Sequence, residues 1–265
     1  MAEHMIGIDV DDMRLETKEA LRAAAELGFS GVQIGTAAGD VTPDALSPSG
    51  RRHLRRLLSD LGLSLPSLTA DYAGLRWTDS KTVEERVERT CRALDLAREL
   101  SAPILSAGAG ALTHPTSGEP SAIALAALRR VGEFADSRGV ALALRPAYDS
   151  PERLERVLRE LNCPSIRVCV DPAAMVMAGA NPLALVERFP DQILLVNARD
   201  GTAGGPDRPG EEVRFGEGDV DLSGLFAALR DADYRGAYVV RRTASQSPIP
   251  DLCTARDELA RFLRS

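Results

Sequence analysis

Histidine is scarce in this chain of 265 residues, in which only His4, His53 and His114 occur. Transition-metal sites rely heavily on imidazole ligands, so this scarcity limits any histidine-rich metal centre. Cysteine is also sparse, and the four cysteines lack the spacing of a metal or redox motif. This usage predicts a reducing, cytoplasmic location with unpaired thiols.

Long apolar runs and an excess of positive charge are missing as well. No stretch approaches the roughly 20 apolar residues of a membrane helix, and the N-terminus lacks the regions of a signal peptide. The net charge of −7 opposes the charge of a nucleic-acid backbone. We therefore expect neither a membrane nor a nucleic-acid partner.

The chain does contain a regular alternation of short apolar segments and longer segments with helical spacing. The apolar segments are apolar on both faces, which is typical of parallel strands covered by helices. Eight of them are predicted as strands, at residues 5–9, 31–35, 63–68, 104–107, 140–144, 167–170, 193–197 and 237–240.

Helices are predicted after each strand. They cover residues 17–27, 49–61, 80–100, 121–138, 222–232 and 250–263, and two more begin at 150–151 and 181–182. Residues 201–218, rich in glycine and proline, are predicted as a loop. The alternation, with no Gly-x-Gly-x-x-Gly after the first strand, favours a single (β/α)8 TIM barrel over a doubly wound sheet. No segment has the composition of a linker, so residues 1–265 are predicted to form one domain.

Polar residues follow the last four predicted strands. Side chains alternate along a strand, so the last inward residue of each strand reaches the carboxyl end of the barrel. That rule predicts convergence of four side chains, those of Arg145, Asp171, Asn197 and Arg241. Barrel enzymes place their chemistry at this end, so these residues form the candidate site.

Five segments carry a family resemblance, at residues 139–146, 168–173, 195–200, 215–222 and 238–241. With them the chain resembles the xylose isomerase-like TIM barrels of the sugar phosphate isomerase/epimerase superfamily. The resemblance covers nearly the whole chain and is densest from residue 140 onward. It implies a barrel fold and, in an active member, an isomerase or epimerase acting on a sugar or sugar-like hydroxy-carbonyl compound.

The resemblance also implies a metal site. In active members of the family, strands five to eight end in Glu, Asp, His and Glu, which bind one divalent metal, and the glutamates move the proton. Here only Asp171 matches. Arg145 and Arg241 stand at the glutamate positions, and Asn197 stands at the histidine position.

Arginine is a poor substitute for a metal ligand, because it has no free lone pair and stays protonated. At roughly 5 Å and an effective dielectric constant of about 20, one guanidinium opposes a divalent ion by about 6–7 kcal/mol. The carboxylates needed for general acid–base chemistry are missing too. We therefore expect no cofactor. The alternative is one divalent cation (Mn²⁺, Mg²⁺ or Zn²⁺) at a rebuilt site that includes Asp171.

The two arginines can be interpreted in two ways. Arg145 and Arg241 would supply the positive charge of the missing metal, with Asp171 as counter-ion, and bind a phosphate or carboxylate. Alternatively, the three side chains form a closed structural salt-bridge network that binds no ligand.

Three further residues are candidates for ligand binding. Glu217, in the loop after strand seven, is predicted to anchor that loop or to face the substrate. His114, after strand four, either contacts the substrate or is simply solvated. Trp77, after strand three, either covers the sugar or fills a packing gap.

The leading hypothesis is a divergent sugar phosphate isomerase/epimerase-like protein with a degenerate metal site. It would be a metal-free binder of a small carbohydrate or anionic ligand, or a pseudoenzyme that regulates an active paralogue. The alternative is an active sugar isomerase or epimerase with a rebuilt metal site around Asp171. A scaffold that only forms a homo-oligomer is the third possibility.

Overall fold

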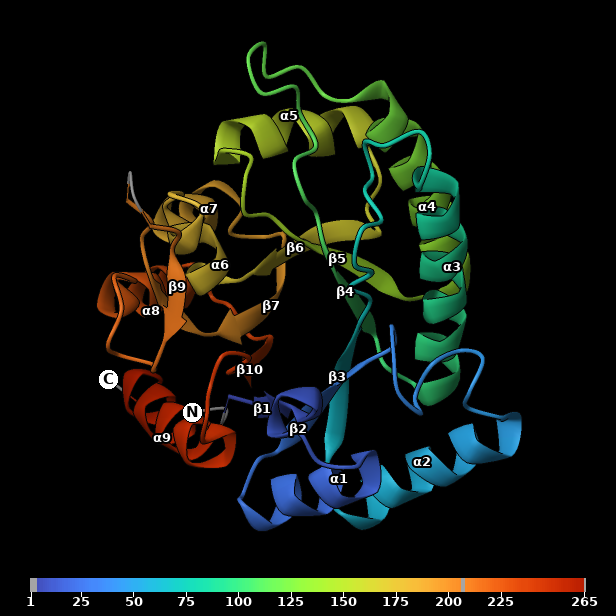
Figure 1. The fold of residues 1–265 in the computed structure, drawn as a ribbon, viewed down its shortest axis with the longest axis vertical. Helices are drawn as coiled ribbons and strands as arrows, with labels where there is room; N and C mark the ends of the chain where they lie inside the picture. The colour runs from blue at the N-terminus through green and yellow to red at the C-terminus, as the bar shows by residue number, and fades with distance from the viewer. Residues whose placement is uncertain (1–3, 206–207, 265) are drawn as a thin grey trace. The chain divides into compact units, whose positions relative to one another are not determined.

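The computed structural model describes residues 4–205 and 208–264. Its main sheet contains strands β1 (Ile6–Asp9), β2 (Gly31–Gly35), β3 (Ser64–Thr69), β4 (Ile104–Gly108), β5 (Ala141–Arg145), β6 (Ile166–Val170), β7 (Ile193–Ala198) and β10 (Ala237–Val240). These strands form a closed parallel barrel in the order β1-β10-β7-β6-β5-β4-β3-β2 (Figure 1). The predicted (β/α)8 barrel is therefore confirmed.

Helices follow the strands along the chain: α1 (Thr17–Glu26), α2 (Pro48–Asp60), α3 (Val83–Leu100), α4 (Ala122–Arg138), α5 (Pro151–Leu161), α6 (Pro172–Met177), α7 (Pro182–Arg188), α8 (Leu222–Asp231) and α9 (Pro248–Phe262). Predicted caps are confirmed where α5 and α7 begin. The Ser150 hydroxyl accepts from the N–H of Arg153, and the Asn181 amide oxygen accepts from that of Leu183. None of the helices in the described chain combines the length and apolar character that a bilayer-spanning segment needs.

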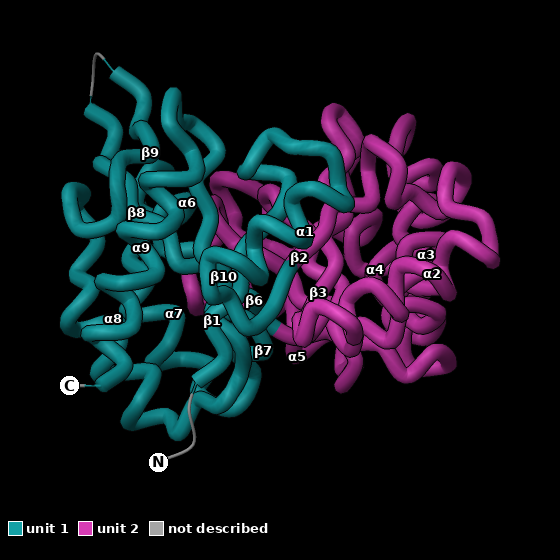
Figure 2. The backbone as a smooth tube through the Cα atoms, turned by 90° about the horizontal axis from the view of Figure 1, so that it is seen from below, with its two compact units in different colours: residues 1–32, 168–265 teal, residues 33–167 magenta. Residues whose placement is uncertain are grey.

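The chain forms two compact units (Figure 2). The first unit comprises residues 1–32 and 168–265, and the second comprises residues 33–167. In the first unit, β10 pairs with β7 so that Val239 lies opposite Asn197. In the second unit, β4 pairs with β5 so that Gly108 lies opposite Arg145. These registers determine which strand-end residues become neighbours within each unit.

Two elements of the first unit differ from the predictions. Residues 201–218 were predicted as a loop, but they contribute to an antiparallel hairpin of β8 (Asp200–Thr202) and β9 (Glu211–Val213). Its strands are too short to show an alternating pattern. Residues 206–207 of that predicted loop lie outside the described residues. The short helix α6 was not predicted either, because six residues are too few to show helical periodicity.

Candidate functional site

Asp171 is the anchor of the polar cluster in the first unit. It follows β6 and caps α6, where its Oδ1 accepts a hydrogen bond from the N–H of Ala174 at 3.1 Å. Its Oδ2 accepts from Asn197 Nδ2 at 3.2 Å and from Arg199 Nη1 at 3.1 Å. The side chain is only 3% exposed, so these donors replace water around the carboxylate.

Arg199 bridges two buried carboxylates. Its Nη1 pairs with Asp171, and its Nε lies 2.9 Å from Glu212 Oε1 in β9. Burial lowers the pKa of Arg199, but the two carboxylates outweigh it and the pKa is raised. This guanidinium therefore stays charged, and it occupies the oxygen of Asp171 that a cation would need.

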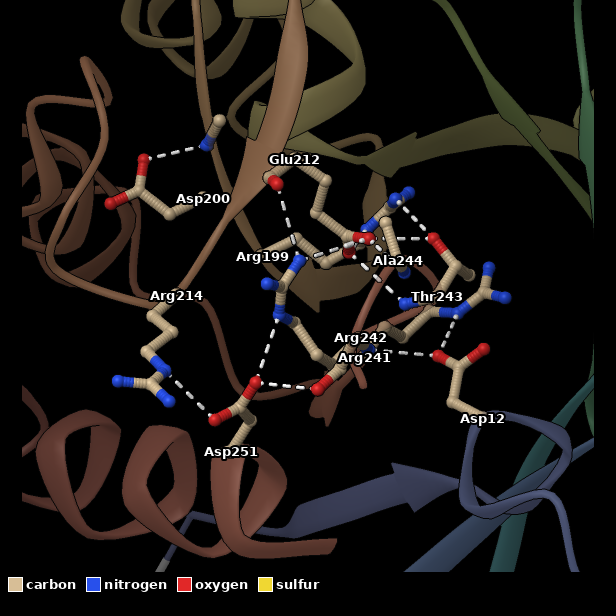
Figure 3. A network of polar contacts seen from close by, with 12 residues as sticks. Asp12, Arg199, Asp200, Glu212, Arg214, Arg241, Arg242, Thr243, Ala244 and Asp251 are labelled. Atoms are coloured by element: carbon tan, nitrogen blue, oxygen red, sulfur yellow. Dashed lines mark hydrogen bonds and ion pairs between the residues drawn. The ribbon is translucent and has the colours of Figure 1, made fainter. Parts of the chain in front are cut away.

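Glu212 ties the hairpin to the segment that follows β10 (Figure 3). Besides Arg199, it accepts hydrogen bonds from the Thr243 hydroxyl at 2.7 Å and from the N–H of Ala244 at 2.7 Å. Arg242 Nη1 lies 3.4 Å from its Oε2. Burial would raise the pKa of Glu212, but Arg199 and these hydrogen bonds lower it. Glu212 is therefore ionised at neutral pH.

The two arginines that follow β10 have separate acidic partners. Arg241 Nε lies 3.1 Å from Asp9 Oδ2, at the end of β1, and 3.3 Å from Asp12 Oδ2. Arg242 Nε lies 3.4 Å from Asp251 Oδ2 in α9. We call this set of ionisable residues in the first unit the strand-end network. Its members are Asp9, Asp12, Asp171, Arg199, Glu212, Arg241, Arg242 and Asp251.

The titration of Asp9 leads to a testable pH dependence. Burial raises its pKa from 3.8 to about 7, although Arg241 acts in the opposite direction. The folded protein therefore holds a proton that the unfolded chain has lost between about pH 4 and 7, and stability falls as the pH rises through this range. Thermal melts should show the melting temperature of Asp9→Asn rising relative to that of the unmodified protein over this range. A difference between the two that does not change with pH would contradict the prediction.

In the second unit, Arg145 ends β5 and forms an ion pair with Asp71 in the loop after β3. Asp71 Oδ1 also accepts a hydrogen bond from the N–H of Gly108 at 3.0 Å. The Arg145 side chain is 9% exposed. Its Nη1 is buried and has no hydrogen-bond partner in the part of the chain that the structure describes. Asp71 was not among the predicted site residues.

Each member of the predicted Arg145–Asp171–Arg241 network has an ion-pair partner that the sequence interpretation missed. Asp171 pairs with Arg199, Arg241 with Asp9 and Asp12, and Arg145 with Asp71. A signal for Arg199 existed, because it follows Asn197 by two residues and period-two spacing places both on one face. Asp9 was recognisable as the carboxylate that ends the first apolar segment.

Trp77 is a packing residue. It is 1% exposed, its Nε1 donates to the carbonyl of Gly108 at 3.2 Å, and the Arg86 guanidinium lies 4.2 Å from its ring centroid. The ring is therefore covered by protein rather than open to a sugar, although the residue contributes to the wall of a cavity.

His114 and Glu217 lie in exposed loops. His114 Nδ1 accepts hydrogen bonds from the N–H groups of Thr116 and Ser117 at 3.3 and 3.2 Å, which shape its own turn. The anchoring role predicted for Glu217 belongs instead to Asp200. That carboxylate accepts from four backbone N–H groups, those of Gly201, Gly216, Gly218 and Val220.

The residues at the family's metal positions do not fit a divalent ion. Asp171 Oδ2 is held by Arg199, and Asn197 supplies one neutral amide oxygen. Arg145 and Arg241 supply no lone pair. Within residues 4–205 and 208–264, no group of three or more His, Cys, Asp or Glu side chains is arranged to hold a metal ion.

A closed parallel barrel with polar groups after its strands defines an α/β-barrel protein of the kind that places small-molecule sites at the strand carboxyl ends. The chain belongs to the xylose isomerase-like TIM barrel family, whose sequence model matches residues 21–265. The predicted resemblance to the sugar phosphate isomerase/epimerase superfamily is thus confirmed.

Individual relatives agree with this assignment. The chain is 27% identical to a 2-epi-5-epi-valiolone 7-phosphate 2-epimerase from Actinoplanes sp., over 85% of this chain and 86% of the relative. A xylose isomerase domain protein from Planctomyces limnophilus has a TM-score of 0.82 at 20% identity, covering 91% of both chains. A D-tagatose 3-epimerase-like protein has a TM-score of 0.81 at 18% identity, covering 98% of this chain and 97% of its own. The two structures support the fold.

Proposed function

We propose that this chain is a divergent member of its family that binds a small carbohydrate or anionic ligand without a resident divalent metal. The observation that carries the proposal is the contact between Arg199 and Asp171, the one residue that matches the family's metal ligands. A guanidinium fixed on that carboxylate neutralises Asp171 in place of a metal ion, so the protein itself supplies the cation.

Anionic and polyol ligands both suit this chemistry. Guanidinium groups bind phosphate and carboxylate through paired hydrogen bonds, and charged side chains also bind sugar hydroxyls. The printed name of the relative from Actinoplanes specifies a 7-phosphate, which supports an anionic ligand here. Without carboxylates at positions 145 and 241, the chain lacks the family's proton-transfer pair, so the proposal is a binding protein or pseudoenzyme.

The second candidate is an active sugar isomerase or epimerase with a rebuilt metal site around Asp171. The 27% identical epimerase favours it. Such a site would require Arg199 to leave Asp171. It could not use Asp200 without releasing backbone N–H groups that the carboxylate holds, because that side chain is 1% exposed and saturated.

Metal content distinguishes the two candidates. We expect elemental analysis of the purified chain to find no stoichiometric Mn, Mg or Zn, because Asp171 is already neutralised by Arg199. Adding Mn²⁺, Mg²⁺ or Zn²⁺ should leave the melting temperature unchanged. About one tightly bound ion per chain, with a metal-dependent rise in melting temperature, would refute the proposal and favour the isomerase.

A further inference from the structure

A cavity of about 620 Å³ lies in the second unit, to which all of its lining residues belong. The loop after β3 and the loop after β4 form most of its wall, and Tyr148 stands at its edge with 71% exposure. Its charged lining residues are Asp71, Arg76 and Arg86. Arg145 forms an ion pair with Asp71, which brings a further guanidinium next to the cavity wall.

Arg86 is an unusual residue in the cavity wall, because its buried guanidinium donates to neutral carbonyl groups. Its Nη2 donates to the carbonyl of Gly108 at 2.6 Å, and its Nη1 donates to the carbonyl of Leu75. Its Nε is buried without a hydrogen-bond partner among the described residues. Burial lowers its pKa to about 10, so the group still carries its charge at neutral pH.

Asp71 occupies the position that an external anion would take. One of its oxygens faces the Arg145 guanidinium, and the other accepts from the N–H of Gly108. A guanidinium combined with a backbone N–H is also a typical donor set for phosphate or carboxylate. Asp71 is 47% exposed, whereas Arg145 is only 9% exposed. Asp71 can therefore turn toward water while the donors remain in place.

We infer that this cavity binds the phosphate or carboxylate group of a small polyhydroxylated ligand, with Arg145 and the N–H of Gly108 as its anchor and Asp71 as the internal group that it displaces. The positive charge of Arg86 and Arg76 favours an anion over a neutral sugar. Tyr148 is free to cover the apolar face of the ligand, which the buried Trp77 is not. This inference deepens the proposed function, because it specifies the ligand class and the anchor.

Calorimetric titration at low ionic strength tests the inference with three probes: glucose 6-phosphate, gluconate and glucose. We expect one or both anions to bind and neutral glucose to bind at least about tenfold more weakly. The tighter of the two anions identifies phosphate or carboxylate as the preferred group.

Two substitutions test the anchor. Asp71→Asn removes the internal competitor and should tighten anion binding by about tenfold, whereas Arg145→Gln should weaken it by at least about tenfold. Matched controls lie in the same unit on other ion pairs: Asp44→Asn, at the Arg92 pair, and Arg130→Gln, at the Glu84 pair. Both controls should leave the affinity within about twofold.

Thermal melts establish that each variant is folded. If Arg145→Gln does not fold, Arg145→Lys keeps the charge but loses the planar fork, and it should weaken binding by about threefold or more. Weaker or unchanged anion binding by Asp71→Asn would overturn the inference. Binding of glucose without either anion would also overturn it, yet would leave the metal-free carbohydrate binder standing. A stoichiometric bound metal would refute the proposed metal-free function, and the anion titration would still test the anion site separately.

Discussion

Replacing Arg199 by methionine is expected to lower the free energy of unfolding by about 3–5 kcal/mol, because it leaves two buried carboxylates without their shared cation. Asp171 and Glu212 are only 3% and 4% exposed, so water cannot take over this role cheaply. Urea unfolding at neutral pH measures the change through the transition midpoint.

The matched control for this substitution is Arg130→Met. Arg130 pairs with Glu84 at 2.8 Å, but the two side chains are 55% and 70% exposed. Exposed ion pairs contribute little to stability, so the urea midpoint of the control should lie close to that of the unmodified protein. If Arg199→Met were as stable as the control, the strand-end network would be solvated in solution rather than buried.

Replacing Asp200 by alanine is the second substitution with a large expected effect, a loss of about 3 kcal/mol or more in the free energy of unfolding. Four backbone N–H groups between positions 201 and 220 lose their acceptor, at distances of 2.8 to 3.3 Å in the intact protein. Hydrogen exchange should show that the amides of Gly216 and Gly218 become unprotected.

Asp219→Ala is the control for Asp200→Ala. The Asp219 carboxylate accepts from one backbone N–H, that of Ala203, at 2.8 Å and near the surface. Its removal should therefore have a smaller effect, about 1 kcal/mol. Equal losses from the two substitutions would show that Asp200 does not act as the central acceptor of this loop.

The barrel is predictable from this sequence because each strand is a short apolar segment bounded by clear helix signals. Ser150 and Asn181 confirm the caps, and the strand ends fall within a few residues of their predicted positions. Besides its own strand pairing, the hairpin of β8 and β9 is held by the side chains of Asp200 and Glu212, most of whose partners are distant in sequence. Such contacts leave no periodic signal.

The candidate site is predictable only in part, for a related reason. Period-two spacing correctly selects Asp171 and Asn197 as neighbours, since their side chains hydrogen-bond at 3.2 Å. It cannot select among several arginines near one carboxylate, because the long side chain of Arg199 reaches across from its own position after β7. Burial and local geometry decide that competition, and neither is visible in one sequence.

The two ion pairs of Arg241, with Asp9 and with Asp12, also constrain which substitutions this protein can accept. Placing a glutamate at position 241 alone would bring a third carboxylate toward two acids that are 1% and 6% exposed. Removing Arg199 alone would leave the buried carboxylates of Asp171 and Glu212 without their shared cation. Each single substitution toward acidic ligands at these strand ends is therefore expected to lower stability, which places a barrier on that route. A lineage can cross it only when several charged positions change together or when a metal arrives with the first substitution.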